Sequence, residues 1–185
     1  MLYIISGVAK SGKTLIAKKL LEKYQISYFS TDYLMMSLSL AAPKLGVNHE
    51  EDDFIVANAM EPYLYFMIKT MVENNIDYCL EGVHFNPLFA KKILTDFKGR
   101  IKFLYLGFSD VSWEDKLDEL NRYRLSLENY WFKHYSYDQM VELVKSLIEV
   151  SSIIKKKSRD FSIPYIDVYN IQDQSESIID KLMKS

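Results

Sequence analysis

The stretch that most restricts the fold of this chain lies at its start. Residues 2–6 form a short apolar run, which predicts a buried strand. The next residues, G-V-A-K-S-G-K-T from Gly7 to Thr14, fit the pattern G-x-x-x-x-G-K-[ST] in full. Residues 13–24 then show the apolar spacing of a helix. A strand, a glycine-rich turn and a helix in this order predict the first unit of a parallel α/β sheet.

The residue types in this loop suit phosphate binding. Glycines allow backbone N–H groups to turn inward around phosphate oxygens, and the following helix adds its positive N-terminus. Lys13 can reach β- and γ-phosphates, and Thr14 can offer a hydroxyl to Mg²⁺. A plain Gly/Ser turn is the alternative. The loop therefore predicts a nucleoside triphosphate site, with contacts from Gly7, Ala9, Lys10, Ser11, Gly12, Lys13, Thr14 and Leu15.

Strand and helix patterns alternate along the rest of the chain. Short apolar runs predict further strands at 27–30, 78–80, 101–106 and 164–168. Helical spacing predicts helices at 32–40, 54–72, 87–97, 113–120, 136–159 and 175–183, with a kink or restart at Pro62 and a capping box from Ser136 to Gln139. Alternation of this kind predicts an α/β fold, a mainly parallel sheet covered on both faces, as a single domain over 1–185.

Composition narrows the class of partners. The net charge of −2 gives no overall attraction to nucleic acid or an anionic membrane, and the basic cluster at 155–159 reads as a solvated helix face. No apolar run approaches the roughly 18–20 residues that span a bilayer. A single cysteine, Cys79, excludes an internal disulfide framework and suits a reducing compartment. We expect a cytoplasmic protein, monomeric or homodimeric, with no nucleic-acid or membrane partner.

Two further motifs carry a resemblance. Together with the glycine-rich loop, Ser30-Thr31-Asp32 and Glu81-Gly-Val-His-Phe-Asn-Pro87 resemble the small-molecule kinases of the P-loop superfamily. The pattern is most similar to the P-loop domain of 2-phosphoglycerate kinases, where S-T-D and E-G-V-H-x-x-P occur in the same order. Nucleotide monophosphate kinases, chloramphenicol phosphotransferase and zeta-type toxin kinases share the plan. The resemblance covers most of the chain, although only the loop motif is specific by itself.

The resemblance implies a three-layer P-loop NTPase fold whose parallel sheet has five strands in the order 2-3-1-4-5, with helices on both faces and a lid insert. It implies ATP and Mg²⁺ as cofactors, a small-molecule acceptor, and lid arginines over the phosphates. In this sequence the lid falls at about 121–136, where Arg122 and Arg124 lie. Two solvated surface arginines are the alternative.

Residues at the ends of the second and third strands are candidates for chemistry. Asp32 can accept or orient the proton of an attacking hydroxyl, or it can cap a helix. Glu81 can hold a Mg²⁺-bound water or orient Thr14, or it can be a strand-end carboxylate without a ligand. Asp32, Tyr33 and His84 are candidate substrate contacts, with a structural loop histidine as an equal alternative for His84.

The sequence differs from the family pattern in where its arginines lie. Residues 33–40 contain no basic side chain, and the first arginine of the chain is Arg100. This counts against 2-phosphoglycerate and nucleotide monophosphates, and favours a less charged acceptor. We therefore predict a Mg-ATP-dependent kinase that phosphorylates a hydroxyl of a small molecule. A non-catalytic or regulatory nucleotide-binding module and a kinase of a macromolecule are the alternatives, and no base-reading N-K-x-D motif of a GTPase is present.

Overall fold

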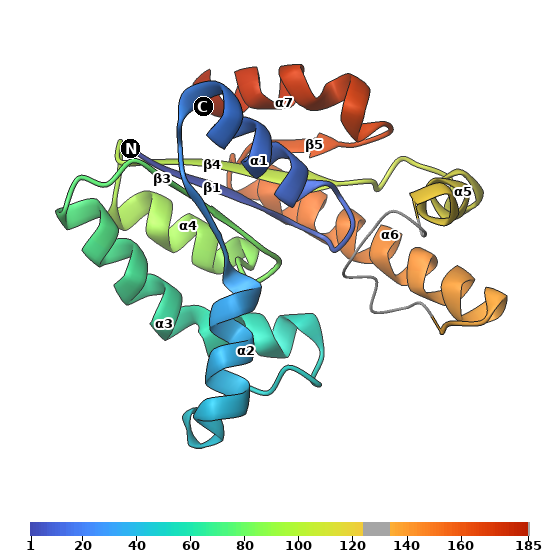
Figure 1. Ribbon diagram of the computed structural model, residues 1–185, viewed down its shortest axis with the longest axis horizontal. Coiled ribbons are helices and arrows are strands. Elements are labelled where there is room, and N and C mark those ends of the chain that lie inside the picture. Colours follow the sequence, from blue (N-terminus) through green and yellow to red (C-terminus); the bar gives the residue numbers. More distant parts are fainter. Residues whose placement is uncertain (124–133, 185) are drawn as a thin grey trace.

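The computed structural model describes residues 1–123 and 134–184, which form an α/β fold around one sheet (Figure 1). The sheet has five parallel strands in the order β2-β3-β1-β4-β5. Their bounds are Leu2–Gly7 (β1), Tyr28–Ser30 (β2), Tyr78–Glu81 (β3), Ile101–Gly107 (β4) and Tyr165–Asp167 (β5). The predicted strand order 2-3-1-4-5 is confirmed.

Helices cover both faces of the sheet, as Figure 1 shows. The described helices are α1 (Lys13–Tyr24), α2 (Thr31–Ala41), α3 (Asp53–Glu73), α4 (Pro87–Asp96), α5 (Trp113–Tyr123), α6 (Tyr137–Asp160) and α7 (Ile171–Lys184), with a 3₁₀ turn, η1, at Pro43–Leu45. Successive strand residues point to opposite faces, so β1 contributes to two cores. Tyr3 and Ile5 pack with α1 and α7, whereas Leu2 and Ile4 pack with α3, α4 and α6.

The helix signals in the sequence are largely confirmed, with differences in α3, in α5 and in α7, which begins at Ile171 rather than at 175. Ser136 and Gln139 form the predicted capping box at the start of α6. Helix α3 is a single helix through Pro62, whose side chain lies on the exposed face, where the missing N–H is least costly. Helix α5 runs to Tyr123, beyond the predicted end, and packs on α6 through Leu117, Leu120, Met140 and Val144.

Two further expectations from the sequence concern the lid and a membrane-spanning segment. Most of the predicted lid, about 121–136, falls at 124–133, outside the described residues. Among the described helices, none is both long enough and apolar enough to cross a bilayer.

Candidate functional site

The glycine-rich loop lies at the carboxyl end of β1, the central strand, and leads into α1. Gly7 has a φ of 123°, and a Cβ there would collide with the Leu106 carbonyl on β4, so only glycine fits. No side chain caps the N-terminus of α1. The first N–H groups of this helix are therefore available to an anion, as the sequence predicts for a phosphate.

Lys13 is folded back into the loop. Its side chain is buried, with 7% of the residue exposed, and Nζ donates a hydrogen bond of 2.6 Å to the Val8 carbonyl. Ser11 Oγ donates to the same carbonyl at 2.9 Å. Burial lowers the pKa of Lys13, and the carboxylates of Glu81, Asp32 and Asp53 oppose this effect. A phosphate that enters the loop would therefore offer the Lys13 ammonium a better partner than a neutral carbonyl.

Thr14 and Glu81 meet beside this lysine. Thr14 is exposed at the start of α1, and its Oγ1 donates a hydrogen bond of 3.1 Å to Glu81 Oε1. The hydroxyl of Ser30, at the end of β2, also bonds Glu81, which is only 3% exposed. Burial raises the pKa of Glu81, while Lys13 lowers it. A hydroxyl and a carboxylate are oxygen ligands of the type Mg²⁺ binds alongside substrate phosphates, so Thr14 and Glu81 fit that ion.

Asp32 lies in the first turn of α2, which follows β2, a strand separated from β1 by β3. The helix N-cap is Ser30, so Asp32 does not occupy the cap position. The Asp32 side chain is 60% exposed, and its Oδ1 is 3.8 Å from His84 Nδ1. Its carboxylate therefore stays accessible at the mouth of the loop. Tyr33, the next candidate, is also exposed and packs edge-on against Phe29.

His84 is buried, and both ring nitrogens have protein partners. Nδ1 lies 2.7 Å from Thr31 Oγ1, and Nε2 lies 3.3 Å from Met35 Sδ. Gly82 allows the first contact, because a Cβ there would collide with the Thr31 hydroxyl. Burial lowers the pKa of His84, against the opposing effect of Asp32. These contacts support the structural alternative for His84, which ties the β3–α4 loop to α2 beside Asp32.

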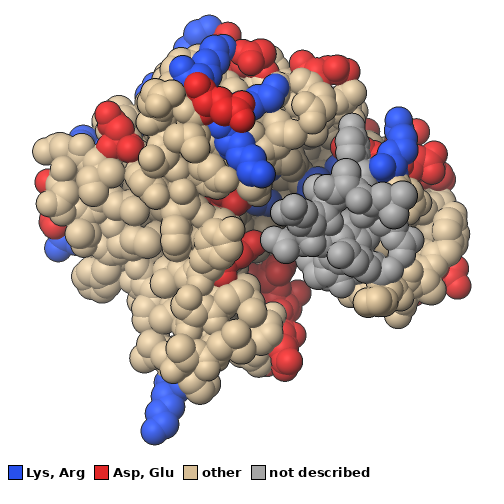
Figure 2. Space-filling view, in the orientation of Figure 1, with Lys and Arg blue, Asp and Glu red and all other residues tan. Residues whose placement is uncertain are grey.

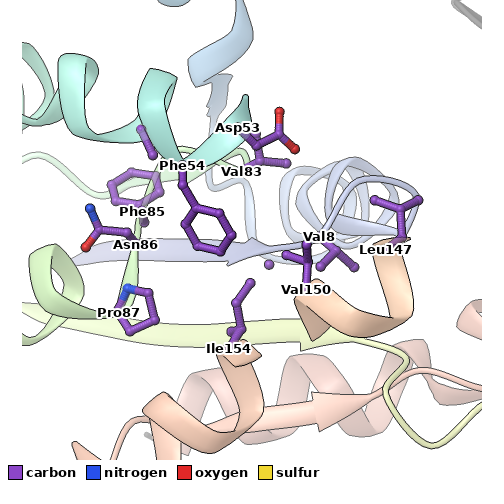
Figure 3. Close-up of a pocket in the computed structure, with 12 residues that line it drawn as sticks. Val8, Asp53, Phe54, Val83, Phe85, Asn86, Pro87, Leu147, Val150 and Ile154 are labelled. Atoms are coloured by element: carbon purple, nitrogen blue, oxygen red, sulfur yellow. The ribbon is translucent and has the colours of Figure 1, made fainter. Parts of the chain in front are cut away.

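A pocket adjoins the loop on the α3 and α6 side (Figure 3). Apolar side chains dominate the lining, which comprises Gly7, Val8, Asp53, Phe54, Ala57, Val83, Phe85, Asn86, Pro87, Leu147, Val150 and Ile154. No basic side chain of the described residues lines it. Its volume of about 20 Å³ holds only about one or two water molecules. In Figure 3 the Asp53 carboxylate lies at the edge and points away from the apolar groups.

Asp53 was not predicted from the sequence. It opens α3 directly after the N-cap Asp52, which accepts a hydrogen bond from the Phe54 N–H. Desolvation, followed by repulsion from Asp52, raises the pKa of Asp53, and Lys13 lowers it. An acidic residue in the first turn of a helix is a common capping signal, so the pattern gave no sign of a site residue.

The predicted lid arginines are not part of the described site. Arg122 is exposed in the last turn of α5, and its Nε donates to the Asp118 carbonyl at 3.3 Å. Arg124 lies outside the described residues. Instead, α5 reaches the loop through Lys116, whose Nζ donates to the Lys10 carbonyl at 3.1 Å. In the sequence Lys116 and Glu119 form an ordinary helical pair at i, i+3, which gives no signal of burial.

Solved structures of several kinases share this architecture. A gluconokinase from Sinorhizobium meliloti superposes with a TM-score of 0.62 at 12% identity, over 98% of this chain and 91% of that chain. A shikimate kinase from Bacteroides thetaiotaomicron gives 0.60 at 12% identity, over 100% and 97%. A kinase-like protein from Chloroflexus aurantiacus gives 0.56 at 15% identity, over 99% and 93%.

These likenesses define the class of the fold. The chain shares the three-layer α/β fold of these kinases, which confirms the fold that the resemblance implies. No protein-family model and no curated protein sequence matches the chain.

Proposed function

We propose that this protein is a Mg-ATP-dependent phosphotransferase that acts on a hydroxyl group of a small molecule. The observation that carries the proposal is the convergence of Lys13, Thr14 and Glu81 at the glycine-rich loop, with Asp32 accessible beside them. Phosphoryl transfer depends mainly on positioning and charge neutralisation, and these groups supply both. The fold shared with gluconokinase and shikimate kinase supports the same reaction class.

Each residue has a role that follows from its position. Lys13 exchanges the Val8 carbonyl for a phosphate oxygen when nucleotide enters. Glu81 holds the Thr14 hydroxyl in place through their hydrogen bond. Mg²⁺, when bound, neutralises charge on the transferred phosphoryl group. Asp32 orients the acceptor hydroxyl and takes its proton, a role for which an exposed carboxylate is suited.

The pocket beside the loop indicates the chemistry of the acceptor. Its walls are apolar, its one ionisable side chain is the carboxylate of Asp53, and no described basic group is present to bind an acidic acceptor. In Figure 2 the front of the projecting part of the molecule carries few charged side chains, with acidic side chains along its right edge and a basic side chain at its tip. An uncharged or cationic hydroxyl compound with an apolar portion fits this surface better than a carboxylate or a phosphate ester.

The small volume of the pocket favours a second function. A space of about 20 Å³ does not admit an organic acceptor without movement of α3, α6 or the β3–α4 loop. A nucleotide-binding module that changes shape without transferring phosphate would need no such space. The two functions differ in whether ADP release depends on an added alcohol.

The test measures ADP release from Mg-ATP with and without pooled hydroxyl compounds, for wild type, Lys13→Ala and Asp32→Asn. Asp138→Asn is the matched control, because Asp138 occupies the first turn of another helix, α6. A kinase shows acceptor-dependent ADP release that Lys13→Ala abolishes, Asp32→Asn reduces about 100-fold or more, and the control preserves. Nucleotide binding without turnover would favour the binding module, and absence of nucleotide binding in the wild type would refute both.

A further inference from the structure

A buried lysine links helix α5 to the glycine-rich loop. Lys116 is only 1% exposed, and its ammonium is surrounded by other residues of the described chain. Nζ donates to the Lys10 carbonyl at 3.1 Å and to Glu119 Oε2 at 2.7 Å, and it lies 4.3 Å from the centre of the Phe108 ring. A buried ammonium requires such partners, so the side chain has little freedom to leave this position.

The carbonyl that Lys116 holds belongs to an unusual residue. Lys10 has a φ of 60°, in the left-handed region that a residue with a Cβ avoids at a cost of about 1 kcal/mol. Lys10 is the fourth residue of the loop, where the backbone has to turn so that N–H groups face a phosphate. An interaction that fixes its peptide group therefore helps to keep the loop in the form that accepts a phosphate.

The same contact joins the loop to helix α5. Helix α5 packs on α6 through a small cluster of Leu117, Leu120, Met140 and Val144. Its last described residue, Tyr123, lies within the first residues of the segment that the sequence predicts as a lid, about 121–136. Through Lys116, the position of α5 depends on the conformation of the loop, and the loop depends on α5.

We propose that Lys116 is a positioning residue that holds the Lys10 peptide in its phosphate-binding conformation and couples nucleotide binding to helix α5. Lys116 acts on the backbone of the loop and does not itself contact the nucleotide. The inference rests on the nucleotide-binding part of the proposed function and needs no acceptor. By thermodynamic linkage, nucleotide that orders the loop also stabilises α5.

The experiment compares Mg-ADP affinity by calorimetry in wild type and Lys116→Met, which keeps the length of the side chain but removes its charge. Lys145→Met is the matched control, because Lys145 also contacts α5, 4.8 Å from the Trp113 ring, but does so from α6 and away from the Lys10 carbonyl. The loss of one hydrogen bond to a charged group predicts affinity about tenfold weaker in Lys116→Met. The control is expected within about twofold of wild type, since an exposed contact of this kind contributes little.

Hydrogen exchange distinguishes positioning from simple packing. In wild type and in Lys145→Met, Mg-ADP should slow amide exchange in α5, whereas in Lys116→Met the protection by Mg-ADP should be lost. If Lys116→Met does not fold, Lys116→Gln is used in its place. Its amide can still bond Glu119 within the helix but is too short to reach the Lys10 carbonyl, so the same results are expected.

The possible outcomes separate this inference from the proposed function. A folded variant at residue 116 that binds Mg-ADP as wild type does, with the same protection of α5, would overturn the role of Lys116 and leave the nucleotide site intact. A variant with a lower Tm but unchanged affinity and protection would show packing alone and would equally overturn it. A wild-type protein that does not bind Mg-ADP would overturn the proposed function and this inference together.

Discussion

Replacement of Lys13 by methionine tests whether the loop keeps a buried charge for function at the expense of stability. The Lys13 ammonium is buried, and its partners do not fully compensate for the loss of water, because the net effect is a lowered pKa. The change removes this charge and keeps an apolar side chain of similar length. Ser11 still donates to the Val8 carbonyl, and Thr14 still donates to Glu81, so these two acceptors keep a partner.

The size of the effect follows from the burial of the ammonium. Replacement of a whole buried ion pair by apolar side chains is neutral or stabilises proteins by about 1–4 kcal/mol, whereas removal of one partner of a pair is destabilising. Within the described residues Lys13 forms no ion pair, but Glu81 loses a favourable neighbour, so we expect only the lower end of this range. For a chain of 185 residues, about 1–2 kcal/mol corresponds to a rise in Tm of roughly 2–8 °C. Lys13→Met should therefore melt at a higher temperature than wild type while losing the increase in Tm that Mg-ADP gives to wild type.

The pH dependence of this difference has a definite sign. The pKa of Lys13 is lower in the folded protein than in the unfolded chain, where it is near 10.5. Between these two values the unfolded state binds more protons, so wild-type stability gains from rising pH. The advantage of Lys13→Met should therefore be full below the folded pKa and shrink as pH rises through it toward 10.5.

Thermal unfolding at several pH values provides the measurement, and Lys18→Met provides the control, because Lys18 is an exposed lysine on the same helix. The control should change Tm by no more than about 2 °C at any pH, as expected for a surface substitution. A Tm of Lys13→Met at or below that of wild type at neutral pH would refute the reasoning. It would mean that the carboxylates around Lys13 fully compensate for its burial.

Three further substitutions test separate features. Gly82→Ala should destabilise the protein by about 1–3 kcal/mol in urea unfolding, because the added methyl group displaces the Thr31 hydroxyl; an unchanged midpoint would contradict the close approach. Tyr105→Phe should cost about 1–2 kcal/mol in the same assay, since it removes the buried hydrogen bond to the Phe85 carbonyl, and a neutral result would show that water replaces it. Glu81→Gln should raise the Mg²⁺ concentration needed for half-maximal nucleotide binding about tenfold, and an unchanged requirement would exclude Glu81 from the metal site.

The central part of the site was predictable because it depends on local backbone chemistry. The pattern from Gly7 to Thr14 fixes a turn between a strand and a helix, and alternation of elements fixes the parallel sheet. The carboxyl ends of parallel strands meet at one edge, so the sequence alone places residues at the ends of β2 and β3 beside the loop. The contact between Thr14 and Glu81 follows directly from this topology.

Asp53 and Lys116 could not be found in the same way, because their roles depend on how helices pack. Asp53 lies in an acidic stretch at the start of a helix, a pattern that many surface helices share on propensity alone. Lys116 sits among charged residues of α5, and only the docking of this helix against Phe108 and the loop makes it a buried residue. His84 was open in the sequence, because a histidine next to strand-end carboxylates suits a substrate contact or a structural role equally. Its buried partners, Thr31 and Met35, support the structural role, and only the packing of α2 supplies them.

The charges around Lys13 bear on the role of Mg²⁺ in the proposed nucleotide site. Carboxylates of Glu81, Asp32 and Asp53 all act on this one lysine, and Lys10 is the other described lysine of the loop. A free nucleoside triphosphate is strongly anionic and would meet repulsion from these carboxylates in a partly desolvated space. A divalent cation held beside Thr14 and Glu81 would remove that repulsion. If the proposed function holds, we therefore expect the acidic surroundings of the loop to make nucleotide binding depend on Mg²⁺.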